Sequence, residues 1–206
     1  MFSKRQVCNQ CLLAASNCIC QLAISVENPV ELLILQHPLE VKESKNSIRL
    51  LTLCAKNIQV AVGEKFSEAD LNQLLFHDQK LPILLYPPTP ENTSMGLKHS
   101  ADFPDLTQTP LSSLRLVVLD ATWKKSRKML YLHPILQALP RLTLMNPPES
   151  LYTIRKAQSQ NQLSSLEACC YAWRQLENNP QVYAELLRAF AAFVDQQRHF
   201  IESSNL

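Results

Sequence analysis

Short apolar runs alternate along the chain with segments whose apolar residues recur at helical spacing. The runs are rich in β-branched residues and end at proline or polar positions, as strands buried on both faces do. They cover residues 30–36, 58–62, 81–86, 114–120 and 141–146. Helical spacing is found near residues 50–54, 68–76, 123–130, 132–139, 165–178 and 181–200. This alternation predicts an α/β fold with a mostly parallel sheet flanked by helices.

The run at residues 114–120 ends in a single carboxylate, Asp120, and Thr122 can cap the helix that follows. Ligands of open α/β sheets bind at the carboxyl ends of the strands. The helix then carries cations in its first two turns, where its dipole favours anions. These cations are Lys124, Lys125, Arg127 and Lys128. The pattern predicts a ligand site at Asp120 and a polyanion beside it.

Other polar residues follow the remaining predicted strands and should gather at the same edge of the sheet. They are His37, Tyr86 with Pro87, Asn146 and the segment 152–156. His37 can be a pocket residue or a histidine with a purely structural hydrogen bond. Ser164 and Glu167 form a capping box, which explains that carboxylate by itself. The long polar stretch 89–113 is either a lid or a plain insertion, and we favour the insertion.

A cysteine cluster lies near the N-terminus, with the spacing C-x2-C-x6-C-x-C. Thiolates this close can surround one tetrahedral ion, for which zinc is the usual occupant. The predicted ligands are Cys8, Cys11, Cys18 and Cys20. An iron–sulfur cluster, a disulfide pair and buried thiols are the alternatives. We expect a small structural zinc knuckle over residues 1–26 and a catalytic domain over residues 27–206.

Composition restricts the classes of function. The net charge of +2 requires a nucleic-acid partner to be held by local patches. Gly63 and Gly96 are the only glycines, so a Rossmann turn and a P-loop are excluded. Residues 6–26 carry no charge, but polar residues interrupt them too often for a signal peptide or a membrane span. Seven cysteines, an odd number, fit a reducing compartment. We expect a cytoplasmic protein without membrane contact or an obligate protein partner.

Several short motifs occur in a fixed order along nearly the whole chain. They are the cysteine cluster, His37-Pro38-Leu39-Glu40 followed by Asn46, Asp120-Ala121-Thr122-Trp123, the pair Tyr152 and Arg155, and Ser164 to Ala168. Together they resemble the DTW-domain family, which includes the tRNA-uridine aminocarboxypropyltransferases. The chain departs from the family pattern at Ala121, where glycine is usual, and at Ser165, where threonine is usual.

The resemblance implies a fold similar to the knotted SPOUT class and S-adenosylmethionine as cofactor. The reaction would transfer the 3-amino-3-carboxypropyl group to N3 of a tRNA uridine, at position 47 of the variable loop, and release methylthioadenosine. An RNA methyltransferase of the same class and a non-catalytic, zinc-dependent RNA-binding module are the alternatives.

Together, the resemblance and the predicted sheet edge assign roles to individual residues. Asp120 would be the general base that takes the N3 proton, and Arg155 would bind the cofactor's carboxylate. The cofactor site would comprise Tyr86, Pro87, Leu119, Thr122, Asn146, Tyr152, Arg155 and Ser165. The tRNA would meet His37, Asn46, Lys124, Lys125, Arg127 and Lys128. Trp123 either packs in the core, which its spacing favours, or stacks on a base.

Overall fold

The computed structural model describes residues 6–87, 100–152 and 163–204. Its centre is a 5-stranded sheet in the order β2-β1-β4-β3-β5, and every pairing is parallel. The strands are β1 (Glu31–Gln36), β2 (Ile58–Val62), β3 (Leu81–Leu85), β4 (Leu114–Asp120) and β5 (Arg141–Leu142). The prediction of a mostly parallel sheet flanked by helices is therefore confirmed.

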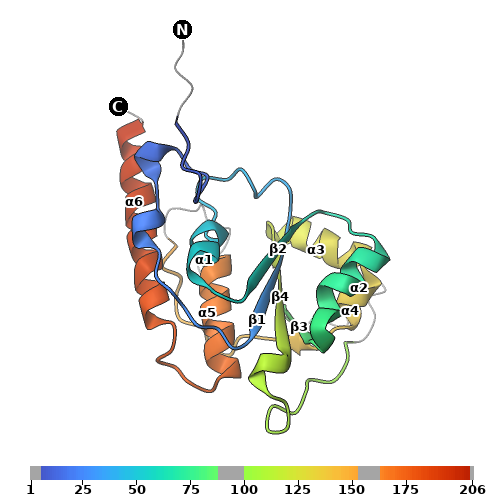
Figure 1. Ribbon diagram of the computed structural model, residues 1–206. Coiled ribbons are helices and arrows are strands. Elements are labelled where there is room, and N and C mark those ends of the chain that lie inside the picture. Colours follow the sequence, from blue (N-terminus) through green and yellow to red (C-terminus); the bar gives the residue numbers. More distant parts are fainter. Residues whose placement is uncertain (1–5, 88–99, 153–162, 205–206) are drawn as a thin grey trace.

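Helices cover both faces of this sheet (Figure 1). They are α1 (Ile48–Cys54), α2 (Glu68–Phe76), α3 (Trp123–Leu132), α4 (Pro134–Ala138), α5 (Ser165–Leu176) and α6 (Ala184–Ser204), with short 3-10 turns at η1 (Ala15–Asn17), η2 (Cys20–Leu22), η3 (His77–Gln79) and η5 (Leu111–Ser113). Alternate residues of β1 enter separate cores: Leu32 packs with α1, α5 and α6, whereas Leu33 packs with α2, α3 and α4. The molecule is thus a three-layer α/β structure.

The connections reverse direction between β1 and β4. From β1 the chain passes through α1 to β2, on one side, and from β4 it passes through α3 and α4 to β5, on the other. A reversal of this kind opens a crevice beyond the carboxyl ends of the two strands, where ligands bind. The last residues of these strands, Gln36 and Asp120, are paired in register. The fold therefore places Asp120 at the crevice.

The predicted helix starts are largely confirmed. The Ser67 side chain accepts a hydrogen bond from the Asp70 backbone N–H at the start of α2, and Ser164 and Glu167 form the capping box of α5. Thr122 stands at the N-cap of α3 without a capping hydrogen bond from its side chain. Within the described residues, no helix has both the length and the apolar character needed to cross a bilayer.

The fifth strand is shorter than the predicted 141–146, and a side chain of α5 explains the difference. The Gln175 amide donates to the carbonyl of Thr143 (3.1 Å) and accepts from the N–H of Met145 (3.1 Å). Backbone groups that would otherwise extend the ladder are hydrogen-bonded to this amide, so the strand ends at Leu142.

Candidate active site

Three segments of the chain donate hydrogen bonds to the carboxylate of Asp120. Its Oδ2 accepts hydrogen bonds from the Gln36 Nε2 (2.9 Å) and the Asn46 Nδ2 (3.1 Å). Its Oδ1 accepts one from the Ser165 hydroxyl (2.6 Å). The side chain is 6% exposed. Because all three partners donate, they fix the plane of the carboxylate and occupy it as an acceptor.

Two of the three partners of Asp120, Asn46 and Ser165, are themselves fixed at helix starts. Asn46 donates to the carbonyl of Glu40 (3.0 Å), and its Oδ1 accepts from the N–H of Ile48 (2.7 Å) at the beginning of α1. Ser165 is the first residue of α5, where the capping box orients the helix. The N-terminal end of α5 faces the carboxylate and favours its negative charge. Asp120 is thus held by side chains that are themselves fixed by hydrogen bonds. We call Gln36, Asn46 and Ser165 with these hydrogen bonds the frame of Asp120.

Glu167 is fully buried and does more than cap α5. Besides the Ser164 N–H (2.8 Å), its carboxylate accepts from the Ser150 hydroxyl (2.7 Å) and the Leu151 N–H (2.6 Å). It therefore ties the segment before Tyr152 to the helix that carries Ser165. The Tyr152 hydroxyl donates to the carbonyl of Lys45 across the crevice. The explanation of Glu167 by capping alone was incomplete.

A polar pocket of about 280 Å³ opens beside Asp120. Its lining carries charges of both signs and several hydroxyl groups. The lining residues are Glu40, Glu43, Lys45, Asn46, Ser47, Asp120, Thr122, Lys125, Tyr152, Ser164 and Ser165. Of the predicted site residues, the structure therefore brings together Asn46, Asp120, Thr122, Lys125, Tyr152 and Ser165. These six residues, from strand ends, loops and helix starts, line one pocket.

Other predicted cofactor residues lie elsewhere. Asn146 lines a second cavity, of about 480 Å³, near the C-terminal end of α5. Leu119 packs in the apolar cluster under α3, and Pro87 is exposed after β3. Arg155 falls outside the described residues. Of the predicted 89–113 loop, residues 89–99 also lie outside them.

Trp123 is not a core residue, so that expectation was wrong. It stands at the first position of α3 and is 47% exposed, whereas Met129 and Leu130 occupy the buried positions of the helix. Its indole stacks on the ring of Tyr86, with centroids 5.3 Å apart and planes at 11°. The Arg141 guanidinium lies 5.4 Å from the centre of the same Tyr86 ring. Burial raises the pKa of the Tyr86 hydroxyl.

The predicted RNA-contacting residues fall into two groups. Members of the first already bond to other side chains of the protein, and members of the second form no ion pair with described residues. His37 is buried: its Nδ1 accepts from the Leu39 N–H (3.2 Å), so its Nε2 is the donor toward Glu64 (3.1 Å). Glu64 also pairs with Lys128 (2.9 Å), and these two neighbours, Lys128 more than His37, lower the Glu64 pKa. Lys125 pairs with Glu40 (3.6 Å).

Lys124 and Arg127 belong to the second group. Both are exposed on α3, and neither forms an ion pair with any described residue. The positive charge of α3 that is left uncompensated is therefore concentrated at these two positions.

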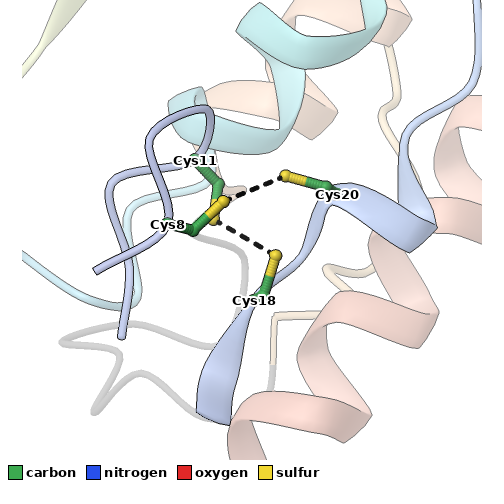
Figure 2. A group of neighbouring side chains, drawn as sticks. All are labelled: Cys8, Cys11, Cys18 and Cys20. Carbon is green, nitrogen blue, oxygen red and sulfur yellow. Dashed lines mark hydrogen bonds between the residues drawn. The ribbon is translucent and has the colours of Figure 1, made fainter. Parts of the chain in front are cut away.

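The four N-terminal cysteines form a compact group of sulfur atoms (Figure 2). Cys8 and Cys20 lie 3.6 Å apart, Cys11 and Cys18 lie 3.8 Å apart, and all four sulfurs are within 4.8 Å of one another. None is in a disulfide. Four ligands at a Zn–S distance of ~2.3 Å would have sulfurs ~3.8 Å apart. Backbone hydrogen bonds from Cys11 and Gln10 lower the Cys8 pKa to about 6. The cluster can hold one metal ion.

The segment with these cysteines packs against the main domain. Ile19 is fully buried in the core beside α5 and α6. The amides of Asn17 and Gln197 bond each other in both directions (2.9 and 3.1 Å). The Arg49 guanidinium donates to the carbonyl of Cys11 (3.0 Å). The cysteine-bearing segment is therefore fixed to α1 and α6, and it lies beside α6 in Figure 1.

Six contributors to the site were not predicted as site residues: Gln36, Glu40, Glu43, Lys45, Ser47 and Ser164. Gln36 orients Asp120, and its signal was a polar residue at the end of an apolar strand that pairs with the Asp120 strand. Glu43 lines the pocket with no sequence signal beyond its nearness to Asn46.

Comparison with known proteins matches residues 5–198 to the family model of the DTW domain. The chain belongs to the DTW domain family. Relatives named tRNA-uridine aminocarboxypropyltransferase 2 are 25% identical over 198 residues in Macaca fascicularis and 27% over 194 residues in Drosophila melanogaster. These alignments cover 94% and 90% of this chain, and 64% and 72% of the relatives.

An Arabidopsis thaliana relative of this DTW protein, named tRNA-uridine aminocarboxypropyltransferase A, is 26% identical over 133 residues, or 61% of this chain and 50% of its own. The chain thus spans between half and about three quarters of the curated relatives it matches. No solved structure matches it. The predicted family is confirmed.

Proposed function

We propose that this DTW-domain chain transfers the 3-amino-3-carboxypropyl group of S-adenosylmethionine to N3 of a tRNA uridine. The observation that supports this reaction best is the fixed carboxylate of Asp120 at the mouth of a polar pocket. The names of the relatives support the same reaction class. A binding module would need the cations of α3, but it would not need a carboxylate oriented by three donors.

The pocket suits an amino-acid group. An ammonium ion needs acceptors, which Glu40 and Glu43 provide, and a carboxylate needs a cation, which Lys125 provides in the same pocket. Thr122, Tyr152 and Ser165 add hydrogen-bonding groups. We propose that these residues hold the aminocarboxypropyl end of the cofactor. Tyr86, Pro87, Leu119, Asn146 and Arg155 remain proposed contacts for its other parts.

When bound, the cofactor supplies a carbon activated by a sulfonium: transfer joins that carbon to uracil N3, breaks its bond to sulfur, and leaves methylthioadenosine and one proton. Asp120 takes that proton. Its Oδ1 accepts one hydrogen bond from described residues and Oδ2 accepts two, so Oδ1 is the better placed oxygen. Gln36, Asn46 and Ser165 keep the carboxylate oriented before the reaction, which lowers the cost of reorganisation.

The remaining proposals concern the fold, the zinc site, the partner and the compartment. The strand order agrees with a SPOUT-like knotted domain over residues 27–206, with a structural zinc knuckle over residues 1–26. Four thiolates would complete the shell of a zinc ion, which gives it a structural role. The partner is tRNA, contacted through His37, Asn46, Lys124, Lys125, Arg127 and Lys128 at a uridine of the variable loop. The expected compartment is the cytoplasm.

The direct test combines purified protein, S-adenosylmethionine and an unmodified tRNA transcript, followed by mass spectrometry of the digested nucleosides and of the spent cofactor. We expect aminocarboxypropyluridine and methylthioadenosine in equal amounts. A methylated nucleoside with adenosylhomocysteine would instead identify a methyltransferase. Bound tRNA with neither product would leave only the binding module.

A further inference from the structure

Helix α3 presents a row of exposed side chains beside the Asp120 pocket. Trp123, Arg127 and Tyr131 are four residues apart, so they lie one above another on the same face. Lys124 projects from the adjoining part of that face, within an arc of about 100°. We call these four residues the α3 stripe. It extends ~12 Å along the helix, and it starts next to Thr122, which lines the pocket.

Packing within the protein leaves about half of each aromatic member of this stripe exposed. Trp123 is 47% exposed and Tyr131 is 55% exposed. The buried positions of α3 are Ser126, Met129 and Leu130, which face α2, α4 and the sheet. Single exposed hydrophobic residues are common on protein surfaces. Two large aromatic side chains aligned on one helix face, with cations between them, are instead typical of a surface that contacts a binding partner.

The charge on the α3 stripe is positive and uncompensated within the described residues. Lys124 and Arg127 form no ion pair there, whereas Lys125 and Lys128 are paired with Glu40 and Glu64. The same helix therefore has cations engaged by the protein and, on the aromatic face, cations available to a partner. An anionic partner with flat rings fits this combination, because stacking and charge can act together.

The first aromatic of the stripe is already oriented. The Trp123 indole stacks on Tyr86, which is 7% exposed, and Tyr86 in turn contacts the Arg141 guanidinium. A ring supported in this way loses little side-chain freedom when a second ring stacks on it. The remaining exposed surface of the indole is the part that a nucleobase can cover.

We propose that the α3 stripe is the docking surface for unpaired tRNA bases next to the modified uridine. Trp123 and Tyr131 stack on bases, and Lys124 and Arg127 neutralise the intervening phosphates. This inference rests on the proposed function, which makes tRNA the substrate. It predicts recognition of unstacked nucleotides rather than of the RNA duplex, since stacked bases expose no face to an aromatic side chain.

The test measures binding of an unmodified tRNA transcript to the full chain and to single variants. We expect Trp123→Ala and Tyr131→Ala each to weaken binding roughly 5- to 100-fold, with little change in salt dependence. Arg127→Ala should reduce the slope of log affinity against log salt by about one. Trp123→Phe keeps a ring and should retain most of the affinity, and Phe103→Ala, at an exposed aromatic outside α3, is the matched control with wild-type binding.

A second measurement separates stacking from folding. The two tryptophans differ in accessibility, because Trp173 is fully buried, so quenching by acrylamide reports on Trp123. Saturating tRNA or a short single-stranded oligonucleotide should protect Trp123 from the quencher, and a blunt RNA duplex should not. Equal protection by the duplex would contradict the stacking role.

The outcomes distinguish the two proposals. Product formed by the wild type, together with wild-type binding in Trp123→Ala and Tyr131→Ala, would overturn the stripe and leave the reaction standing. If tRNA binding depended on Trp123 and Tyr131 while the wild type formed no product, the docking role of the α3 stripe would be supported and the proposed reaction refuted. Failure of the wild type to bind tRNA would overturn both.

Discussion

Two clusters of side chains organise this molecule, and they are held together in different ways. Around Asp120, amides and a hydroxyl from β1, the segment before α1 and the start of α5 form a closed set of hydrogen bonds within a large core. Around Cys8 to Cys20, short turns bring sulfurs together with only weak contacts between the thiols themselves. The first cluster is held by hydrogen bonds within the protein, whereas we propose that the second is stabilised by a bound metal ion.

Removing the charge of Asp120 tests the role of the first cluster and should have the largest effect, which is on turnover. In Asp120→Asn, the new oxygen can accept from Gln36 and Asn46, and the new amide can donate to the Ser165 hydroxyl. The frame is kept and the basic site is lost. We expect turnover to fall on the order of 10²–10⁴, measured in single-turnover experiments, while the affinity for S-adenosylmethionine stays within a few-fold.

The matched control for Asp120→Asn is Asp105→Asn, a carboxylate on an exposed loop whose hydrogen bonds are local. It should leave turnover unchanged. If Asp120→Asn abolished cofactor binding and turnover together, Asp120 would be a binding or structural residue rather than the base.

The frame itself is tested at Glu167. Glu167→Ala removes the acceptor of three donors and leaves the buried Ser164 N–H and the part-buried donors of Ser150 and Leu151 without that partner. We expect a loss of about 3 kcal/mol in the free energy of unfolding, measured in urea, since each buried unsatisfied donor costs about 1–3 kcal/mol before relaxation. Glu185→Ala, at an exposed carboxylate in the first turn of α6, is the control, and an equal loss there would remove the special role of Glu167.

The cysteine cluster provides the converse test. The wild type should contain about one equivalent of zinc, and replacement of all four cluster cysteines by serine should abolish metal binding. Because Ile19 and Asn17 still anchor the segment to α6, the α/β core should stay folded, with new protease cleavage confined to residues 6–26. The metal content is measured by atomic emission. Cys54→Ser, at a buried thiol outside the cluster, should keep the metal, and zinc persisting in the quadruple variant would refute the site.

The smallest expected effect concerns Glu64, whose pKa is lowered by Lys128 and His37. A depressed carboxylate pKa contributes stability above its ordinary value near 4.5, and that stability is lost as the pH falls through the folded-state value. Glu64→Gln should therefore lower the melting temperature slightly at pH 7 and not at strongly acidic pH. A difference that persisted unchanged at both pH values would exclude the ion pairs as its cause.

The sequence predicted which residues lie at the carboxyl ends of the strands better than it predicted the contacts that these residues make. The apolar runs located the strand ends, so Asp120 and its neighbours were expected together. Trp123 was placed in the core because helical spacing does not give the rotation of the first helical turn relative to the sheet. Asn146 was placed at the pocket because the amide of Gln175, distant in sequence, could not be seen to end the strand. Glu167 was read locally, since its bonds to Ser150 and Leu151 depend on the tertiary fold.

The most direct test of the central claim follows two labels of one cofactor into tRNA. S-adenosylmethionine carrying ¹⁴C in its carboxyl group and ³H in its methyl group is incubated with an unmodified tRNA transcript and either the wild type or Asp120→Asn. The account predicts that the wild type transfers ¹⁴C to the tRNA and leaves ³H in methylthioadenosine, with transfer strongly reduced in Asp120→Asn. Transfer of ³H to the tRNA, or undiminished ¹⁴C transfer by Asp120→Asn, would contradict it.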